Sequence, residues 1–290
     1  MTEATATPIS VSLKCLHGDC LEEMKLLPDR SIDLFACDLP YGVLTNKKGA
    51  MPTGRTTHGI ANAGCDWDVK IDLVALWREI ERLCKNEHTP VLMFCSARFG
   101  VELVNSKPDW FRYDLIWDKE VGVSFLSANK MPLRCHELIY VFAKKSANYN
   151  RIDEYKEGMI ARTRKTSNPR GSNFLPNSVG ISQPDNIQQE NMRCSLSIIR
   201  DRLDRYKSHP TAKSITLYKW LISRYSNEGD TVLDPTAGSF NSGRACAELN
   251  RNYIGIEKDE KFYNANKIEK IEMDFQHSAE YSDSNNDKQE

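Results

Sequence analysis

A mainly apolar segment that stops at an acidic residue constrains the fold of this chain most. Residues 32–37 have the composition of a buried strand. Asp38 follows directly, at the carboxyl end of that strand, where open α/β sheets bind their ligands. Pro40 fixes one backbone angle and Gly42 releases the chain, so we expect Tyr41 on a stiff, exposed turn. The segment therefore predicts a buried strand that ends in a turn facing a ligand.

The chemistry of this turn suits a flat heteroaromatic amine. The carboxylate of Asp38 and the backbone carbonyl of Leu39 can accept the two N–H bonds of such an amine, and the ring of Tyr41 can stack on it. An ordinary exit from a strand, with a turn that begins at an aspartate, explains the same residues equally well. The turn alone therefore does not identify a function.

Strand and helix patterns alternate along most of the 290 residues, a length that fits one large domain or one domain with an insertion. This alternation predicts an α/β fold with a mainly parallel sheet. The strand patterns cover residues 13–16, 31–37, 90–95, 113–117, 136–143, 231–233 and 253–256. The helical patterns cover residues 21–27, 72–84, 98–105, 212–226, 245–249 and 259–271.

A polar, basic region interrupts the alternation at residues 144–207. It contains thirteen lysines and arginines but seven acidic residues, whereas the whole chain has a net charge of −1. A local basic excess on an otherwise acidic protein is typical of a surface that binds a phosphate backbone. A solvated insertion is the alternative. The candidate phosphate-binding residues are Arg162, Arg164, Lys165 and Arg170.

Residues 231–257 have the pattern of a strand, a loop, a helix and a second strand, which is typical of a nucleotide-type site. Glu257 ends the second strand, where its carboxylate can accept bonds from ribose hydroxyls. The loop has neither a G-x-G-x-x-G pattern nor the lysine of a phosphate-binding loop. Asp234 at its start favours a cationic ligand such as S-adenosylmethionine, although a βαβ unit without a ligand fits the spacing equally well.

Several short motifs, taken in order, resemble the β class of the amino-methyltransferase family of DNA enzymes, which methylate adenine N6 or cytosine N4. Residues 38–41 (Asp-Leu-Pro-Tyr) resemble the family's catalytic D/N/S-P-P-Y/F signature. Residues 234–240 resemble its D-P-F-x-G-S-G cofactor loop, and residues 209–214 its H-P-T-Q-K-P element. Residues 18–20, 135–142 and 253–257 match three further elements. The resemblance covers roughly residues 13–271.

This resemblance implies a Rossmann-like, S-adenosylmethionine-dependent methyltransferase fold with an inserted target-recognition region. It implies catalytic roles for Asp38, Leu39, Pro40 and Tyr41. It implies cofactor-binding roles for Asp19, His209, Lys213, Asp234, Pro235, Ala237, Gly238, Ser239 and Glu257. The implied reaction is methyl transfer to adenine N6 in double-stranded DNA after base flipping, without a metal.

The chain departs from the family pattern at five positions. Leu39 replaces the first proline of the catalytic signature, but its carbonyl remains available. Thr236 and Phe240 depart in the cofactor loop, and Ala212 and Ser214 depart in the H-P-T element. These departures keep a DNA-binding relative without catalysis as an alternative. Cytosine-N4 methylation, RNA methylation and methylation of a protein glutamine are further alternatives, although an aspartate at position 38 favours adenine.

Together with the composition of the two ends and the break in the pattern at residue 144, the same resemblance divides the chain into five parts. We expect a flexible tail at residues 1–10, a catalytic half at 11–143 and a target-recognition region at 144–207. A cofactor-binding half at 208–275 and a disordered acidic tail at 276–290 complete the chain. It also allows a homodimer and a cognate restriction enzyme as partners.

The nine scattered cysteines include no Cys-x-x-Cys pair, which predicts reduced thiols and makes a structural zinc site unlikely. Neither a signal peptide nor an apolar run of about 20 residues is visible in the sequence, so we expect a cytoplasmic protein without a membrane span.

Overall fold

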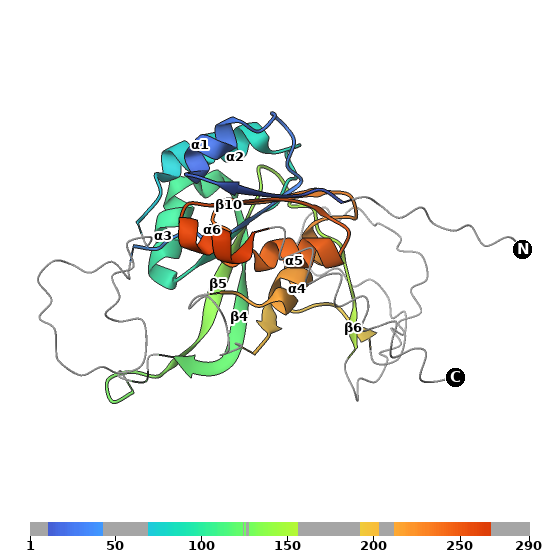
Figure 1. Cartoon of the computed structure of the whole chain (residues 1–290). Helices are drawn as coiled ribbons and strands as arrows, with labels where there is room; N and C mark the ends of the chain where they lie inside the picture. Colours follow the sequence, from blue (N-terminus) through green and yellow to red (C-terminus); the bar gives the residue numbers. More distant parts are fainter. Residues whose placement is uncertain are drawn as a thin grey trace, which may run out of the picture. The chain divides into compact units, whose positions relative to one another are not determined.

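The computed structural model of the chain describes residues 11–42, 69–123, 125, 128–155, 192–202 and 212–267 (Figure 1). The chain forms two compact units. The larger unit contains residues 1–150 and 197–290, and the smaller one contains residues 151–196. The predicted tails, His209 and the candidate phosphate-binding residues Arg162, Arg164, Lys165 and Arg170 all lie outside the described residues.

An eight-stranded sheet forms the centre of the larger unit. Seven of its strands run in one direction, and β5 is antiparallel to both of its neighbours. This arrangement confirms the predicted α/β class and the mainly parallel sheet. In spatial order the strands are β1 (Leu13–His17), β10 (Asn252–Glu257), β9 (Thr231–Asp234), β2 (Leu34–Cys37), β3 (Val91–Cys95), β5 (Arg134–Phe142), β4 (Phe111–Val123) and β8 (Ile198–Arg200).

The strand order brings the two predicted sites together. β2 lies between β9 and β3, and both neighbours are parallel to it. Phe35 pairs with Leu233, so the chain leaves β2 and β9 at the same edge of the sheet. Residues 38–41 and residues 234–240 therefore begin side by side, although almost 200 positions separate them in the sequence. This is the kind of edge at which open α/β sheets bind ligands.

Helices cover both faces of the sheet (Figure 1). α1 (Cys20–Lys25), α2 (Leu73–Leu83) and α3 (Ala97–Ser106) pack on one face with an apolar cluster that includes Met24 and Ile80. α4 (Ile215–Tyr225) and α5 (Asn241–Glu248) contribute to the cluster on the other face, and Tyr263 of α6 (Glu260–Asn266) packs against that cluster. Because both faces are covered at the centre of the sheet, β2 and β3 consist entirely of buried residues.

Side-chain caps fix where most of these helices begin. In each case a carboxylate or hydroxyl oxygen accepts a hydrogen bond from a free backbone N–H of the first turn. The capping residues are Asp19, Asp72, Ser96, Ser214 and Asp259. Asp19 and Ser214 lie in motifs of the sequence analysis, so these motifs also contain helix-start signals.

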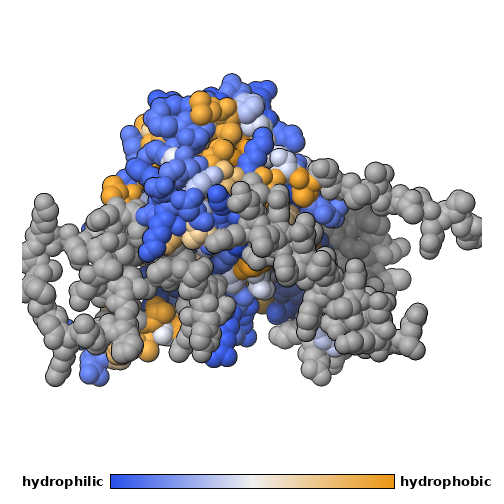
Figure 2. Space-filling model, viewed as in Figure 1, coloured by the Kyte–Doolittle hydropathy of each residue, from blue (hydrophilic) through white to orange (hydrophobic). Residues whose placement is uncertain are grey.

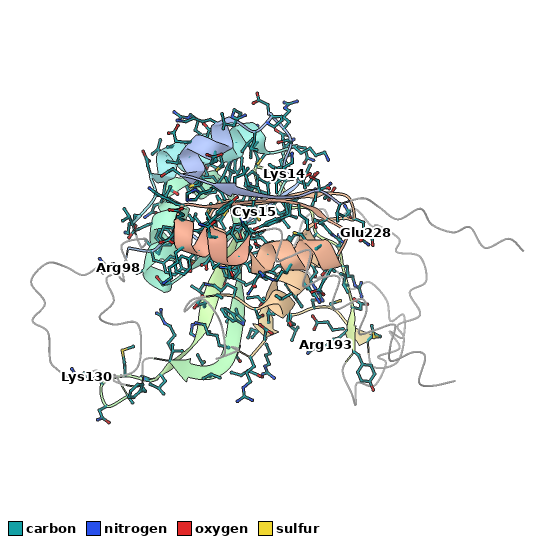
Figure 3. The ribbon with its side chains drawn as sticks, in the orientation of Figure 1. Lys14, Cys15, Arg98, Lys130, Arg193 and Glu228 are labelled. Carbon is teal, nitrogen blue, oxygen red and sulfur yellow. The ribbon has the colours of Figure 1, made fainter. Side chains whose placement is uncertain are left out.

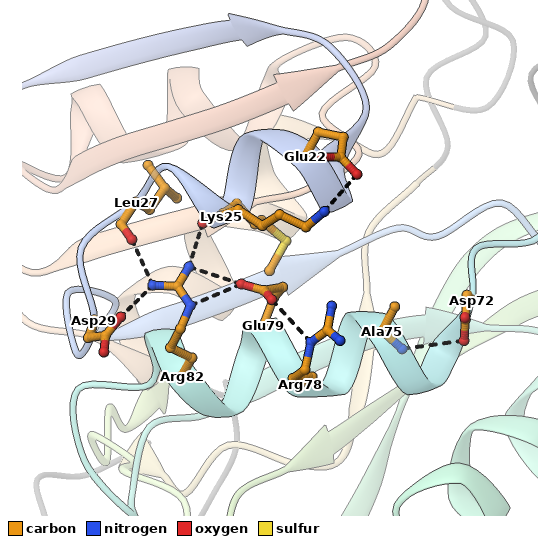
Figure 4. Close-up of polar contacts among 10 residues, drawn as sticks. Glu22, Lys25, Leu27, Asp29, Asp72, Ala75, Arg78, Glu79 and Arg82 are labelled. Carbon is orange, nitrogen blue, oxygen red and sulfur yellow. Dashed lines mark hydrogen bonds and ion pairs between the residues drawn. The ribbon is translucent and has the colours of Figure 1, made fainter.

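An arginine cluster joins α2 to the segment that leads into β2 (Figure 4). Arg82 donates to the backbone carbonyls of Met24 and Leu27 at 2.7 and 2.8 Å. Its guanidinium also pairs with Asp29 and with buried Glu79. These bonds satisfy carbonyls at the end of α1 and hold the start of β2 beside α2, so they help to fix the strand that leads to Asp38.

The sequence patterns underestimated β4 and β5 and missed β8. β4 and β5 form an antiparallel hairpin that is longer than the predicted strands, and Lys130 lies in its connection (Figure 3). A 3₁₀ helix, η1 (Pro108–Trp110), precedes β4. β8 lies within the region 144–207 and joins the main sheet beside β4. In the smaller unit, β6 (Glu154–Tyr155) and β7 (Met192–Arg193) form an antiparallel pair.

Exposed apolar side chains are dispersed over the larger unit. Figure 2 shows hydrophobic residues interspersed among hydrophilic ones where the surface is coloured, and Leu26, Val74 and Val101 are the most exposed of those on or next to α1 to α3. In the described ranges, no helix has the length and apolarity needed to cross a membrane. The eight cysteines that the structure describes are all free thiols.

Candidate active site

The turn after β2 presents Asp38 beside the buried Leu39 and the partly buried Pro40. Leu39 is only 2% exposed and packs into the apolar cluster beneath α1 to α3. In the described residues no donor bonds to the Leu39 carbonyl, so this oxygen can accept a hydrogen bond from a ligand. Pro40 is partly buried and follows in the same turn. The turn thus combines a carboxylate with an available carbonyl, as the sequence predicted.

Tyr41 differs from its prediction, because it is partly buried rather than exposed. Its ring packs against that of Phe99 with the centroids 5.2 Å apart. Its hydroxyl donates to Oδ1 of Asp38 at 3.2 Å. Burial, reinforced by the nearby Asp38 carboxylate, raises the pKa of Tyr41, so the hydroxyl remains a hydrogen-bond donor at neutral pH.

Lys213 lies against Asp38. The sequence resemblance placed it among the cofactor ligands, but its Nζ lies 2.7 Å from Oδ2 of Asp38 and 3.3 Å from Oε2 of Glu137. The side chain is 5% exposed. Burial alone would lower the pKa of Lys213, but the two carboxylates outweigh it and raise the pKa, so the group is an ammonium. The side chain therefore belongs to the turn at Asp38.

Glu137 and Lys119 complete a buried group of charges behind Asp38. Glu137 comes from β5, and its Oε1 accepts a hydrogen bond from Nζ of Lys119 on β4. Burial would raise the pKa of Glu137, but Lys213 and Lys119 together lower it, so the carboxyl is ionised. In the sequence, Glu137 lies within the motif at residues 135–142, and no motif includes Lys119. An acid directly before the apolar residues 138–143 is the one signal that pointed to this group.

The second loop begins at Asp234, whose side chain is fully buried. Its Oδ1 accepts from the backbone N–H of Thr236 at 3.1 Å, and its Oδ2 accepts from Oγ of Ser242 at 2.5 Å. Burial raises the pKa of Asp234 to about 7. A carboxylate with no exposed surface does not face a ligand in this structure. Asp234 instead connects the loop to the start of α5.

Glu257, at the end of β10, holds the middle of the same loop. Its Oε2 accepts from the backbone N–H of Gly238 at 2.8 Å, and its Oε1 accepts from that of Asp259 at 2.7 Å. Gly238 has a φ of 52°, which a glycine adopts without strain. The Ala237 N–H also donates to the Ile256 carbonyl at 2.9 Å. The loop is therefore fixed over the carboxyl end of β10.

Phe240 occupies the position of the second family glycine and has a φ of 54°. Its ring is fully buried, with its centroid 6.4 Å from that of Tyr263. A left-handed conformation costs an ordinary residue roughly 1–2 kcal/mol. Burial of the ring offsets this cost, so the loop keeps its glycine-like bend with an aromatic residue. Pro235 and Ser239 are buried in the same loop.

Asp19 joins this group from β1. β1 pairs with β10 so that His17 lies opposite Glu257, and the Gly18 N–H donates to the Glu257 carbonyl at 3.1 Å. Oδ2 of Asp19 accepts from Nζ of Lys258 at 2.9 Å. Partial burial alone would raise the pKa of Asp19, but the hydrogen bonds from Lys258 and Leu21 lower it. Asp19, Gly238 and Glu257 thus gather at one edge of the sheet.

The residues around this loop fit the chemistry of S-adenosylmethionine. The ligand carries an ammonium and a sulfonium, which favour nearby carboxylates, and ribose hydroxyls, which need acceptors. Asp19 and Glu257 provide such carboxylates. Oγ1 of Thr236 is buried without a hydrogen-bond partner, so the loop also has an unused polar atom that a ligand can satisfy. The described residues contain no group of three or more metal-binding side chains.

Comparisons with known proteins agree with this geometry. The family model described as DNA methylase matches residues 32–268. DNA adenine methyltransferase YhdJ of Escherichia coli (strain K12) is 27% identical over 267 residues, which cover 91% of this chain and 84% of that protein. Type II methyltransferase M.HinfI of Haemophilus influenzae is 28% identical over 262 residues, which cover 85% of this chain and 65% of that protein.

Two solved structures share the fold. The M1.HpyAVI–SAM complex has a TM-score of 0.52 and 20% sequence identity, and the match covers 87% of this chain and 96% of that one. The PvuII DNA methyltransferase (cytosine-N4-specific) has a TM-score of 0.55 and 13% identity, and the match covers 87% of this chain and 84% of that one. At these identities the likeness shows a common architecture.

Proposed function

The chain belongs to the DNA methylase family, whose model matches residues 32–268, and from this premise we propose that it transfers a methyl group from S-adenosylmethionine to adenine N6 in DNA. The observation that carries the proposal is the turn at Asp38. Its partly exposed carboxylate and the available Leu39 carbonyl lie at the sheet edge that also carries the loop at Gly238.

The turn can activate an amine that is a poor nucleophile. The lone pair of an exocyclic amino nitrogen is delocalised into its ring. When Asp38 and the Leu39 carbonyl accept its two N–H bonds, they orient the nitrogen and stabilise the positive charge that develops on it. Each carboxylate oxygen of Asp38 already accepts one protein hydrogen bond and retains a second acceptor position for the base. Asp38 can then take the proton that the methylated nitrogen loses.

The remaining roles follow from position. S-adenosylmethionine supplies an electrophilic methyl group on its sulfonium when it is bound. We assign Asp19, Gly238 and Glu257 to direct cofactor contacts and the buried Asp234, Pro235, Ala237 and Ser239 to the shape of the loop. His209 stays a candidate by resemblance. We assign Tyr41 to stacking on the base, which must leave the duplex to reach the turn.

We assign DNA recognition to residues 144–207, with residues 11–143 as the catalytic half and 208–275 as the cofactor-binding half. The basic excess of the middle region and the match to the DNA methylase family support this division. Arg162, Arg164, Lys165 and Arg170 are its candidate phosphate contacts. A DNA substrate also implies a cytoplasmic location.

Modification-sensitive sequencing of DNA incubated with the protein and S-adenosylmethionine tests the proposal. We expect N6-methyladenine within one short sequence motif, and we expect no mark with Asp38→Ala. Methylation of cytosine N4 in place of adenine N6 would show that the target base is cytosine and would leave the proposed mechanism unchanged. Unmodified DNA together with clear DNA binding would identify a relative without catalysis.

We also propose two partners, a cognate restriction enzyme and a second copy of this chain. The first is suggested by relatives named type II methyltransferases, and the second by the family resemblance. A cognate restriction enzyme would cleave the same motif in unmethylated DNA and leave methylated DNA intact, which a digestion assay measures. A homodimer would sediment at about twice the 33.1 kDa mass of the chain.

A further inference from the structure

We propose that Lys213 is a positioning residue of the methyl-transfer reaction, which fixes the Asp38 carboxylate with the help of Glu137 and Lys119 and makes no contact with the cofactor. The inference rests on the proposed function, because it gives the carboxylate of Asp38 the amine-binding role described above. It adds a structural reason why this carboxylate is held in one orientation.

Two carboxylates and one aromatic ring surround the Lys213 ammonium. An ammonium has three N–H donors. Nζ lies 2.7 Å from Oδ2 of Asp38, 3.3 Å from Oε2 of Glu137 and 5.2 Å from the ring centroid of Phe94, over its face. Each of these three neighbours attracts a cation. Its two ion-pair partners are Asp38 and Glu137, so the side chain serves the turn at Asp38.

The backbone of Lys213 is fixed independently of its side chain. Nδ2 of Asn241, the first residue of α5, donates to the Lys213 carbonyl at 2.7 Å. The next residue, Ser214, caps α4 through its hydroxyl. The lysine therefore reaches Asp38 from a rigid anchor on the cofactor side of the sheet edge, and it connects the two sites through one residue.

The charges in this group balance. Asp38 and Glu137 contribute two carboxylates, and Lys213 and Lys119 contribute two ammonium groups. Both lysines are buried. Oε2 of Glu137 is buried without a formal hydrogen bond, and its ion pair is with Lys213. Loss of Lys213 would thus leave two carboxylates facing one another with a single cation, Lys119, on the far side of Glu137.

Such a pair favours uptake of a proton, because two close carboxylates resist simultaneous ionisation. A proton on Asp38 would remove an acceptor that the amine of the base needs. The groups that act on the two carboxylates are Lys213, Lys119, Tyr41, Cys37, Cys95, Asp234 and Tyr218. Lys213 and Lys119 are the cations of this set, and Lys213 is the one paired with both acids.

The test compares Lys213→Met, which keeps the length of the side chain, with Lys213→Met/Glu137→Gln, which removes one charge of each sign. Lys219→Met is the matched control, because Lys219 lies on α4 in a half-exposed ion pair with Glu248. We measure single-turnover methyl transfer from pH 5 to 9, S-adenosylmethionine binding by calorimetry, and the titration of the Glu137 carboxyl by ¹³C NMR without ligands.

For Lys213→Met we expect a single-turnover rate at least about thirtyfold lower, which is less than the roughly hundredfold or greater loss for a contact made directly to the reacting group, because Lys213 acts through Asp38. We expect the acid limb of its pH profile to move to higher pH, the Glu137 carboxyl to titrate at higher pH, and the cofactor dissociation constant to stay within about threefold. We expect the double variant to be at least about tenfold faster than Lys213→Met and to have the wild-type acid limb, because the group of charges around Asp38 is again neutral overall.

A double variant no faster than Lys213→Met would show that the lysine acts only through packing and would overturn the proposal. So would a large loss of cofactor affinity in Lys213→Met, which would return the residue to the cofactor site. The NMR titration separates this proposal from the proposed function. An unchanged Glu137 titration in Lys213→Met refutes the charge group even if wild type methylates DNA, and a shifted titration supports it even if wild type methylates nothing.

Discussion

Asp38 and Asp234 follow neighbouring strands at the same edge of the sheet, yet their surroundings are opposite. The side chain of Asp38 is 22% exposed and is paired with the buried ammonium of Lys213. The side chain of Asp234 is fully buried, has neutral hydrogen-bond donors, and has its pKa raised to about 7 by burial. The first acid keeps acceptor positions for a ligand, whereas the second uses both oxygens to hold its own loop.

The difference teaches that a strand end gives the location of an acid but its neighbours determine its role. A carboxylate beside a buried cation stays charged and can bind developing positive charge. A carboxylate surrounded by hydroxyl and amide donors in a dry loop acts as a structural hydrogen-bond acceptor. The predictions below test this contrast, beginning with the largest expected effect.

Asp38→Asn should lower the single-turnover methyl-transfer rate about a thousandfold, or roughly 4 kcal/mol. Asparagine has one acceptor oxygen, and Lys213 will take it, because an ammonium repels the amide NH₂ group. That NH₂ group then faces the N–H donors of the base. Cofactor binding measured by calorimetry should stay within about threefold. A variant with more than a tenth of the wild-type rate would show that Lys213 does not control this orientation.

The matched change at the other acid, Asp234→Asn, should alter the pH dependence of stability. The folded-state pKa of Asp234 is raised from 3.8 to about 7, so its favourable contribution exists below pH 3.8 and is lost as the pH rises to about 7. Urea unfolding at pH 5 and pH 8 should show that wild type loses about 3 kcal/mol relative to the variant between these values.

Other titrating groups are common to both proteins, so the difference between them isolates Asp234. Equal changes in stability from pH 5 to pH 8 would contradict the contrast, because they would mean that Asp234 is ionised in the folded protein throughout this range.

The different surroundings of Asp38 and Asp234 could not be predicted from the sequence. The periodic elements were predictable because their apolar patterns and caps are local, as Asp72 and α2 illustrate. The proximity of Asp38, Glu137 and Lys213 depends on the spatial order of β2, β3 and β5, which local patterns do not specify. The contact of Lys213 with Asp38 was missed because the backbone of Lys213 lies beside the loop that begins at Asp234, while its long side chain reaches the other turn.

β8 was missed for a related reason. Three residues are too few for a periodic signal, and the strand lies in a polar region whose other residues have no repeating pattern. Its edge position beside β4 leaves Ile198 and Arg200 exposed and Ile199 buried, so only one side chain marks the buried face. Pairing with β4 therefore stabilises a strand that its own sequence barely indicates.

The bend of the cofactor loop can be tested with a smaller change at Phe240. Replacement by alanine or glycine removes the same buried ring, so both variants should be destabilised by about 3–4 kcal/mol. Glycine also relieves the cost of the left-handed φ, and Phe240→Gly should therefore be more stable than Phe240→Ala by about 1 kcal/mol in urea unfolding. Equal stabilities would show that the positive φ is not maintained without the ring.

The smallest effect is expected at Leu39, which follows Asp38 in the sequence as Pro235 follows Asp234. The proposed reaction uses the carbonyl of Leu39, and in the described residues its N–H donates no hydrogen bond. Leu39→Pro should therefore keep the methyl-transfer rate within about threefold, since proline retains the carbonyl and the N–H that it removes is not used.

Leu39→Ala is the matched control, because it removes the buried side chain and leaves the backbone unchanged. We expect it to cost about 2–3 kcal/mol of stability with little effect on rate. A stable but inactive Leu39→Pro would mean that the turn needs the backbone freedom of a non-proline residue to aim Asp38. The contrast between the two acids would then depend on the residue after each acid as well as on the charges around it.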